Sequence, residues 1–562
     1  MRFSQILNPS KPESTIVKFP AIVKPDYHAR ALRYLAIALL LASCGTGFSP
    51  SAHDSLEQIA DDYWRHELDE SVALQIKFGI PTRHLPDVSY AHAQGEAQFA
   101  RSIVQRLDRI DATTFSEDDR LTFKILRWEN QLTIDGLPYF WYRFQVTPYS
   151  FRNLGIQQVF TMQRLTDADR TRLLSELPHV VDQMLEVLRQ QRERGIVLPK
   201  AEVPIVKQTV SRAIPGNSSL QHLADSISET NAPEAIGLAQ YPGGDAAYRY
   251  FVRARTTVDM TPQQIHDLGL REVERINGEM QKVRDAAGFK GTKTEFHLFL
   301  KSDPRFFAKT PEEVGDRLTR YLHKIEPHVP ELFSRAPKAR YDVQRLDPAL
   351  EGGITFGYYQ QPTATDPIGH YYYNGSRLNE RNLLFAPALI AHELVPGHHF
   401  QIARQEENEN LPPFRRENFD TAYVEGWGEY AASLGSGMRL YDDVYDRYGR
   451  LMMDMMLSVR LVVDTGMNAL GWSRDRAADV MRENTLLSET EISTETLRYA
   501  VDMPAQALAY KIGSLKMLEL RSKAQQQLGA GFDIRQFHEW IIGSGSMPLP
   551  ILEEHVAAEM RR

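Results

Sequence analysis

The chain lacks three features that would each have pointed to a class of protein. Among its 562 residues there is a single cysteine, Cys44, so no disulfide can form within the chain. It has no basic excess, because 65 Lys and Arg stand against 73 Asp and Glu, a net charge of −8. Nucleic-acid binding usually needs a basic face, so we expect no nucleic-acid partner. Beyond the N-terminal segment, no uninterrupted apolar run reaches the roughly 18 residues of a membrane-spanning helix.

A short export signal stands near the N-terminus. Arg30 and Arg33 precede the apolar segment Leu35 to Ala42, which is too short to span a bilayer. The segment runs into Leu-Ala-Ser-Cys, ending at Cys44. This motif resembles the bacterial lipobox, in which the signal is cut before the cysteine and the thiol is lipidated. A buried thiol after an apolar helix is the alternative.

The lipobox divides the chain into three parts. Residues 1–43 form an N-terminal extension and lipoprotein signal peptide, 44–53 a lipidated linker, and 54–562 the body. Acyl chains, and no membrane-spanning helix, would then hold the mature protein to the membrane. Because Gly45 follows the cysteine in place of Asp, we expect an exported lipoprotein at the outer membrane, facing the periplasm.

The body reads as mainly helical. Its hydrophobic content of 42 % and charged content of 25 % are those of a globular protein. Helix-start signals stand at Thr261, Thr310 and Ser488, each with Glu or Gln three residues later. Residues 352–374, rich in Gly, Pro and Tyr, predict short strands instead. We expect one large helical domain, in one or two lobes, with a central cleft and a small β-sheet near the active site.

A metal-binding motif follows an apolar run. In zinc peptidases of the His-Glu-x-x-His type, the two His face one way from a helix and hold the metal, and the Glu acts as general base. Here His392 and Glu393 begin such a motif, but Pro396 occupies the position of the second His. The first His and the Glu are therefore candidates for a metal ligand and a base.

The second ligand must come from beyond the proline. On a regular helix His398 would lie about 600° round from His392, roughly on the opposite side. His399 would face the right way but lie about 10.5 Å further along, too far for one zinc ion. Pro396 and the glycine after it can interrupt the helix. A bulge that absorbs two residues would bring His398 into place, so we favour His398, with His399 as the alternative.

A third ligand is expected on a later helix. Glu425 and Glu429 are four residues apart within Glu-Gly-Trp-Gly-Glu-Tyr and so share a helix face. We expect Glu425 to ligate the metal and Glu429 to accept the remaining ring N–H of a ligand His. Taken alone, both glutamates could equally be solvated surface charges.

Four further residues are candidates for contacts with the reacting substrate. Tyr510, near the C-terminus, could donate its phenol proton to a developing oxyanion. Packing as a core aromatic is the alternative. Arg498 and Lys511 are candidate substrate anchors, and Asn374 is predicted at an exposed strand edge, where an extended peptide can bind.

These motifs resemble the bacterial family known as domain of unknown function 885. The match rests on His-Glu-Leu-Val-Pro-Gly-His-His-Phe-Gln at 392–401, Val-Glu-Gly-Trp-Gly-Glu-Tyr at 424–430 and Ala-Gln-Ala-Leu-Ala-Tyr-Lys-Ile-Gly at 505–513. It extends over most of the chain, from about residue 55. The family in turn looks like a distant relative of helical gluzincin peptidases, such as angiotensin-converting enzyme and bacterial carboxypeptidases.

The resemblance implies a large helical, zincin-like domain with a zinc cofactor. By it, His392, His398 and Glu425 would hold Zn²⁺, Glu393 would be the base and Tyr510 the oxyanion donor. One departure stands out, because Asn468 occupies a position where the family commonly has His, which bears on substrate choice or activity.

Three functions remain open from the sequence. The first is a zinc-dependent peptidase that hydrolyses short peptides with a metal-activated water. The second is a metal-dependent hydrolase of another amide or of an ester at the same site. The third is a metal-binding envelope lipoprotein without catalysis.

Overall fold

The computed structural model describes residues 51–562 except 349–350, 352–355 and 364. The predicted lipobox and Cys44 lie outside the described residues. From Ala52 to Arg562 the chain forms one compact unit, and its first helix starts two residues before the predicted boundary at 54. No helix among the described residues combines the length and the apolar character that crossing a bilayer requires.

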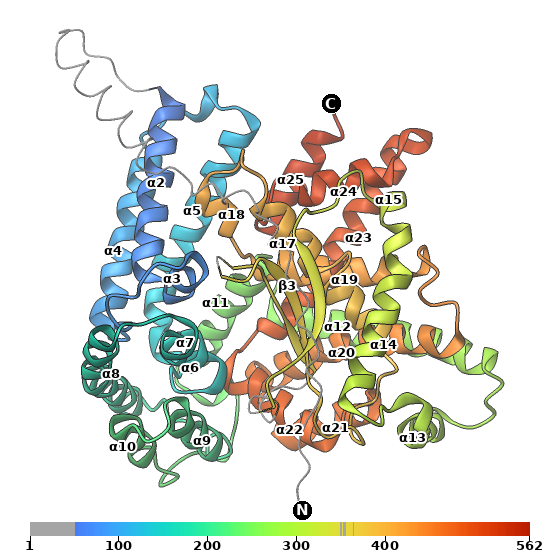
Figure 1. Ribbon diagram of the computed structural model, residues 1–562, viewed down its shortest axis with the longest axis horizontal. Coiled ribbons are helices and arrows are strands. Elements are labelled where there is room, and N and C mark those ends of the chain that lie inside the picture. Colours follow the sequence, from blue (N-terminus) through green and yellow to red (C-terminus); the bar gives the residue numbers. More distant parts are fainter. Residues whose placement is uncertain (1–50, 349–350, 352–355, 364) are drawn as a thin grey trace, which may run out of the picture. The chain divides into compact units, whose positions relative to one another are not determined.

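The unit is mainly helical, as predicted, with one small sheet (Figure 1). The first half holds α2 (Ala52–Glu70), α3 (Val72–Phe78), α4 (Tyr90–Leu107), α5 (Glu117–Gly136), α6 (Pro148–Asn153), α7 (Ile156–Met162), α8 (Asp167–Glu193), α9 (Val203–Ala213), α10 (Ser218–Ser226), α11 (Gly244–Thr256) and α12 (Pro262–Ala286). The second half holds α13 (Lys293–Ser302), α14 (Pro311–Ile325), α15 (Val329–Leu332), β1 (Arg340–Arg345), β2 (Gly357–Gln360), β3 (Ile368–Tyr373), α16 (Ala386–Glu393), α17 (His398–Glu406), α18 (Pro413–Glu417), α19 (Thr421–Ser433), α20 (Val444–Asn468), α21 (Arg474–Asn484), α22 (Glu489–Leu497), α23 (Ala509–Leu528), α24 (Ile534–Ile542) and α25 (Leu549–Glu559).

The three predicted helix starts are confirmed. Thr261 and Ser488 each form a full capping box, in which the hydroxyl and the third helical side chain satisfy each other's backbone N–H. Thr310 caps α14 by accepting from the backbone of Glu313. Local chemistry therefore sets the first residues of α12, α14 and α22.

The sheet has the order β1-β3-β2, with β1 parallel and β2 antiparallel to β3. Both β2 and β3 lie in the segment predicted to form strands, whereas β1 precedes it and was not predicted. Since β3 is the central strand, the expected exposed edge at Asn374 is wrong. The Asn374 amide instead donates to the carbonyl oxygen of Glu351 at 2.6 Å and accepts from the backbone of Ser376 at 2.9 Å, so it shapes the turn after β3.

Helices α19 and α23 pack with their backbones in close approach near the site. Gly426 of α19 faces Gly513 of α23, and a Cβ at Gly513 would overlap the carbonyl oxygen of Ala422 and lie 2.7 Å from the Gly426 Cα. A Cβ at Gly426 would lie 2.5 Å from the Gly513 carbonyl carbon. Two glycines are thus required for the crossing, which carries Glu425 and Tyr510 on adjacent helices.

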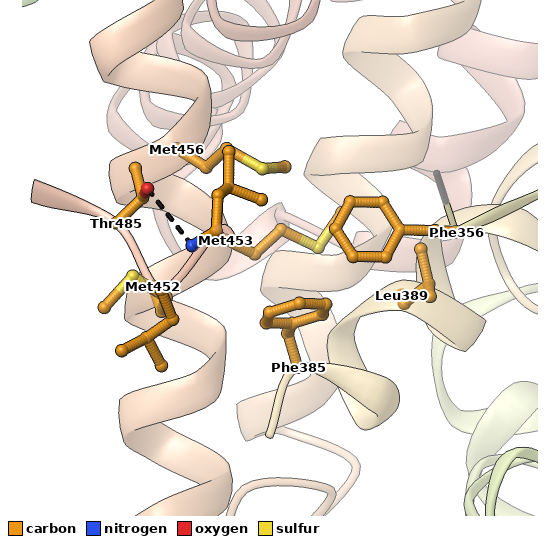
Figure 2. Close-up of a pocket in the computed structure, with 9 residues that line it drawn as sticks. Phe356, Phe385, Leu389, Met452, Met453, Met456 and Thr485 are labelled. Carbon is orange, nitrogen blue, oxygen red and sulfur yellow. Dashed lines mark hydrogen bonds between the residues drawn. The ribbon is translucent and has the colours of Figure 1, made fainter. Parts of the chain in front are cut away.

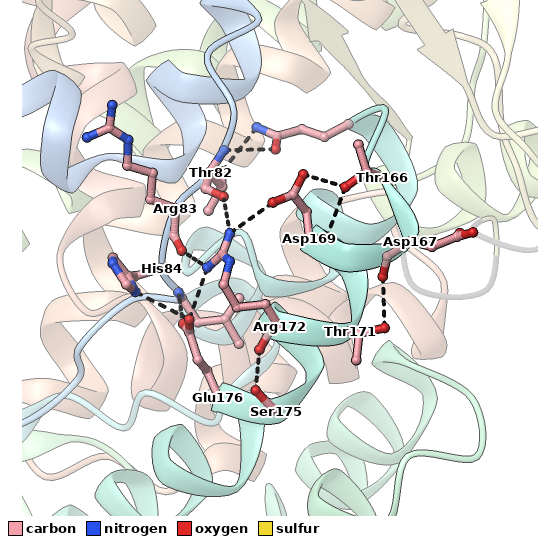
Figure 3. A network of polar contacts seen from close by, with 12 residues as sticks. Thr82, Arg83, His84, Thr166, Asp167, Asp169, Thr171, Arg172, Ser175 and Glu176 are labelled. Carbon is pink, nitrogen blue, oxygen red and sulfur yellow. Dashed lines mark hydrogen bonds and ion pairs between the residues drawn. The ribbon is translucent and has the colours of Figure 1, made fainter.

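A polar network ties the segment after α3 to the start of α8 (Figure 3). Arg172 of α8 donates to the backbone carbonyls of Thr82 and Arg83 and pairs with Glu176 at 3.1 Å. Glu176 in turn accepts from the backbone of Leu85 at 2.8 Å. Since Arg172 and Glu176 both bond to the backbone of residues 82–85, the network fixes the path of this segment.

We expect Gly513→Ala to destabilise the protein by about 1–3 kcal/mol, because the added methyl group cannot be accommodated between two backbones. The matched control is Gly278→Ala in the middle of α12, where a Cβ would meet nothing within 4 Å. That change should stabilise the helix by about 0.5–1 kcal/mol. Urea unfolding followed by circular dichroism measures both, and equal midpoints for the two variants would contradict the close crossing.

Candidate metal centre

The helix that carries the first histidine stops one residue later. α16 ends at Glu393 and α17 begins at His398, with a four-residue connection between them. The indole N–H of Trp427 donates to the carbonyl oxygen of Pro396 at 2.9 Å and holds this connection against α19. The predicted two-residue bulge is therefore wrong in form, because the proline-glycine pair separates two helices instead of bending one.

The break brings three predicted ligands together. Nε2 of His392 lies 3.6 Å, and Nε2 of His398 3.3 Å, from the same carboxylate oxygen of Glu425. The two imidazole rings are 4.6 Å apart and nearly perpendicular, at 82°. One donor atom from each residue lies within 4.8 Å of the others. Two imidazole nitrogens and one carboxylate oxygen therefore converge on a single point.

His399 does not reach this point. One of its ring nitrogens lies 3.1 Å from the Tyr359 hydroxyl and the other 3.1 Å from the carbonyl oxygen of Ala339. The ring is fully buried, and burial lowers its pKa to about 4. With both nitrogens engaged, His399 has a structural part, and the geometry favours His398 of the two alternatives.

The electrostatics suit metal ligands. Burial lowers the pKa of His392 to about 4, so its imidazole is neutral near pH 7. Burial would also lower the pKa of His398, but the hydrogen bond and charge of Glu425 outweigh it and raise that pKa. Burial opposes the ionised form of Glu425, yet the two imidazoles hold its pKa well below the ordinary range. Glu425 is therefore ionised near neutral pH, the form in which a carboxylate ligates a metal.

A second carboxylate stands behind the first histidine. Nδ1 of His392 makes no hydrogen bond within the described residues and lies 3.9 Å from Glu429, the predicted orienting group. Glu429 is buried and pairs with Arg450 at 2.7 Å. The ring of His392 also lies against the backbone, because a Cβ at Gly428 would come within 2.9 Å of it. Gly428 thus restricts the orientation of this ring, whereas the predicted hydrogen bond from the ring to Glu429 is not formed.

The predicted base lies at the end of α16. Glu393 is half-buried and accepts a hydrogen bond from the backbone N–H of Tyr359 on β2. Burial raises the pKa of Glu393 to about 7, with His398 and Glu425 acting on it in opposite directions. A carboxyl group with this pKa can both take up and release a proton near neutral pH.

Tyr510 lies against the ring of His392. The two rings are stacked, with centroids 6.1 Å apart and 18° between planes. The amide of Gln506 donates to the phenol oxygen at 3.3 Å and faces Glu425 at 3.5 Å. Burial, with the charge of Glu425, raises the pKa of Tyr510 to about 12, so the phenol keeps the proton that an oxyanion would need.

The two predicted substrate anchors, Lys511 and Arg498, differ in their surroundings. Lys511 is buried and pairs with Glu272 at 2.9 Å and with Asp454. Its prediction as a substrate anchor is therefore wrong. Arg498, in contrast, donates to the side-chain oxygen of Gln506 at 2.7 Å and so stands next to the site.

Asn468 has a structural part in this chain. Its amide nitrogen donates to the carboxylate of Asp464 at 3.0 Å and to the carbonyl oxygen of Tyr499 at 3.0 Å, and its oxygen accepts from the backbone of Leu238. Asn468 is completely buried at the end of α20, and its hydrogen bonds tie this helix to the turn after α22.

The predicted central cleft stays a prediction. The structure shows an apolar pocket of about 30 Å³ one turn before the metal-site end of α16 (Figure 2). It contains none of the predicted site residues. Its lining comes from α16, α20 and the flanks of β2 and α22: Phe356, Phe385, Leu389, Met452, Met453, Met456, Thr485, Leu486 and Leu487.

A family model matches most of the chain. The model of the bacterial protein family of unknown function DUF885 matches residues 73–229 and 217–556. The chain belongs to the DUF885 family. The predicted resemblance is thereby confirmed, while the family description assigns no activity. No curated protein matches the chain by sequence.

Two solved structures share the fold of this DUF885 protein. A presumed lipoprotein from Colwellia psychrerythraea has a TM-score of 0.81 at 21 % identity, covering 91 % of this chain and 99 % of that one. A presumed lipoprotein of unknown function from Shewanella oneidensis has a TM-score of 0.70 at 15 % identity, covering 90 % and 99 %. The helical architecture with its small sheet therefore recurs in distant bacterial proteins.

Sequence reasoning gave no role to three neighbours of the site in this DUF885 protein. Gln506 bridges Glu425, Tyr510 and Arg498, and Arg460 places its guanidinium 4.9 Å from the Tyr510 ring. Tyr359 contacts Glu393 through its backbone. Gln506 stands inside the motif at 505–513 that resembles the family, which was the available signal, whereas a backbone donor such as that of Tyr359 leaves none.

We expect reconstituted protein to hold about one Zn²⁺ per chain at this centre. His398→Ala should lose that ion, because it removes one of three ligands, while His399→Ala should keep it. A second group of donors, His66, Glu70 and Glu96, also lies within 4.8 Å of one another, so a His66→Ala background separates the two. Elemental analysis measures the metal, and equal loss in the His398 and His399 variants would contradict the assignment.

Proposed function

We propose that the chain is a zinc-dependent peptidase that hydrolyses short peptides at the His392, His398 and Glu425 centre. The observation that carries this proposal is the convergence of the three donors, with Glu393 adjacent and Tyr510 opposite. Two imidazoles and one carboxylate form a ligand set of hydrolytic zinc sites, in which a further coordination position stays open for water or substrate.

The residues present fit a bound zinc ion. Both histidines turn Nε2 to Glu425, and neither Nδ1 makes a hydrogen bond in the described part of the chain. When bound, Zn²⁺ would polarise a carbonyl group and make a water molecule easier to deprotonate. Other divalent ions accept the same ligands, so the metal content is itself part of the proposal.

The chain's own residues then divide the proton transfers. Glu393 takes a proton from the attacking water and passes it to the leaving amine, for which a pKa of about 7 is well matched. Tyr510 donates its phenol hydrogen to the oxyanion of the tetrahedral intermediate. Gln506 holds the phenol oxygen toward Glu425 and so positions the donor.

Two further parts of the proposal concern the fold class and the cellular location. The arrangement of ligands on α16, α17 and α19 supports a helical zincin-like domain with a cleft over the site, which would favour short peptides over folded proteins. We place the protein at the outer membrane, facing the periplasm and anchored through Cys44. The lipobox-like motif supports this, as does the likeness to two presumed lipoproteins.

We expect Glu393→Gln to reduce turnover of a short-peptide mixture by about 100-fold or more while zinc stays bound. The amide keeps the size of the side chain but cannot take up the proton. Glu409→Gln, at an exposed position on the connection after α17, is the control and should leave turnover unchanged. Mass spectrometry of the products measures cleavage.

Full activity of zinc-loaded Glu393→Gln would overturn the mechanism. Cleavage of activated esters but of no peptide would move the protein to the wider class of metal-dependent hydrolases. Retention of zinc with neither activity would favour a metal-binding lipoprotein without catalysis.

A further inference from the structure

Two buried arginines beside the metal centre share one carboxylate. Arg460 pairs with Glu495 at 3.1 Å, and Arg498 pairs with Glu495 at 3.2 Å. Their side chains are 7 % and 11 % exposed. Within the described residues no other carboxylate lies at ion-pair distance from either guanidinium. The group of three therefore carries one positive charge in excess.

The carboxylate that the two arginines share is engaged by a third group. Glu495 also accepts from the Tyr499 hydroxyl, which itself accepts from Arg460 at 2.7 Å. A further buried acidic group, Asp464, is already bonded to the hydroxyl of Tyr248 and to the backbone of Ala505, and burial raises its pKa to about 7. Burying an uncompensated cation is costly, so the excess charge calls for an anion from outside the protein.

Of the two arginines, Arg498 is the one placed to meet that anion. Arg460 is enclosed, with its guanidinium 4.9 Å from the Tyr510 ring and 5.6 Å from the Tyr499 ring. Arg498 contacts Gln506, the side chain that also faces Glu425 and the Tyr510 phenol. Its Nε has no hydrogen-bond partner in the described part of the chain.

Two further features mark the surroundings of Arg498. It begins a single π-helical turn, 498–502, and such turns occur often at functional sites. Across from it, the half-buried Tyr149 of α6 places its ring 5.4 Å from the guanidinium. On the same short helix, the Arg152 guanidinium lies 5.0 Å from the ring of Tyr358 on β2.

We propose that Arg498 binds a carboxylate of the substrate, so that the site takes short peptides with a free carboxylate next to the scissile bond. This inference rests on the proposed hydrolytic function, whose substrate class it narrows. A single glutamine separates Arg498 from the ligand Glu425, so one substrate residue spans the distance. The anion completes the ion pairing of Arg498, and a guanidinium suits it because its planar fork matches a carboxylate.

The test measures binding as well as turnover. N-acetylated dipeptides with a free C-terminal carboxylate are compared with the same dipeptides as C-terminal amides. Calorimetric titration into zinc-loaded Glu393→Gln protein should show the acids binding at least about tenfold tighter. Adding Arg498→Gln should abolish that difference, and Arg498→Lys should restore part of it. The control is Arg474→Gln, which removes a nearby arginine bonded to Thr496 and Ser493 and should leave the difference intact.

The outcomes separate this inference from the function it rests on. Equal binding of acids and amides, binding of neither, or a preference that survives Arg498→Gln would each overturn the carboxylate site. In the last case the acid would be contacting the metal directly. Acid-selective binding without any cleavage by the wild type would keep the carboxylate site and refute the peptidase. A circular dichroism spectrum and midpoint near those of wild type show that the Arg498→Gln variant is folded.

Discussion

At the crossing of α19 and α23 the two backbones are in contact, because neither Gly426 nor Gly513 carries a side chain. Everything proposed for the site depends on that approach. Glu425 precedes one glycine by one residue, and Tyr510 precedes the other by three, so a larger separation of the helices would move the proposed metal ligand and the proposed oxyanion donor apart. Two residues without side chains thus determine a polar geometry that neither of them touches.

Much of this arrangement could be predicted from the sequence, and the reasons differ from part to part. Helix starts such as Thr261 were predictable because capping involves residues a few positions apart. The grouping of His392, His398 and Glu425 was predictable because ligand chemistry restricts the residue types and the proline excludes a regular helix. The form of the interruption was not, since proline and glycine permit a bulge or a break equally, and the choice is made by tertiary contacts such as the Trp427 hydrogen bond.

The errors share a physical cause. Lys511 and Asn374 look like exposed polar groups in a sequence, but each is satisfied by partners far away in the chain or by a local turn. Strand β1 was missed because its position beside β3 is fixed by parallel pairing across an intervening segment, which leaves no local pattern. A sequence reports what a residue can do, and only the fold decides which partner it meets.

The close packing around the ring of His392 has a thermodynamic consequence. Gly428 contacts it on one side, Tyr510 stacks on another, and Glu429 stands behind it. Its rotational entropy is therefore lost when the chain folds and not when a ligand arrives. Under the proposed function, a cation entering the centre would meet at least one donor already held by its surroundings, and its affinity would draw on conformational freedom that folding has already removed.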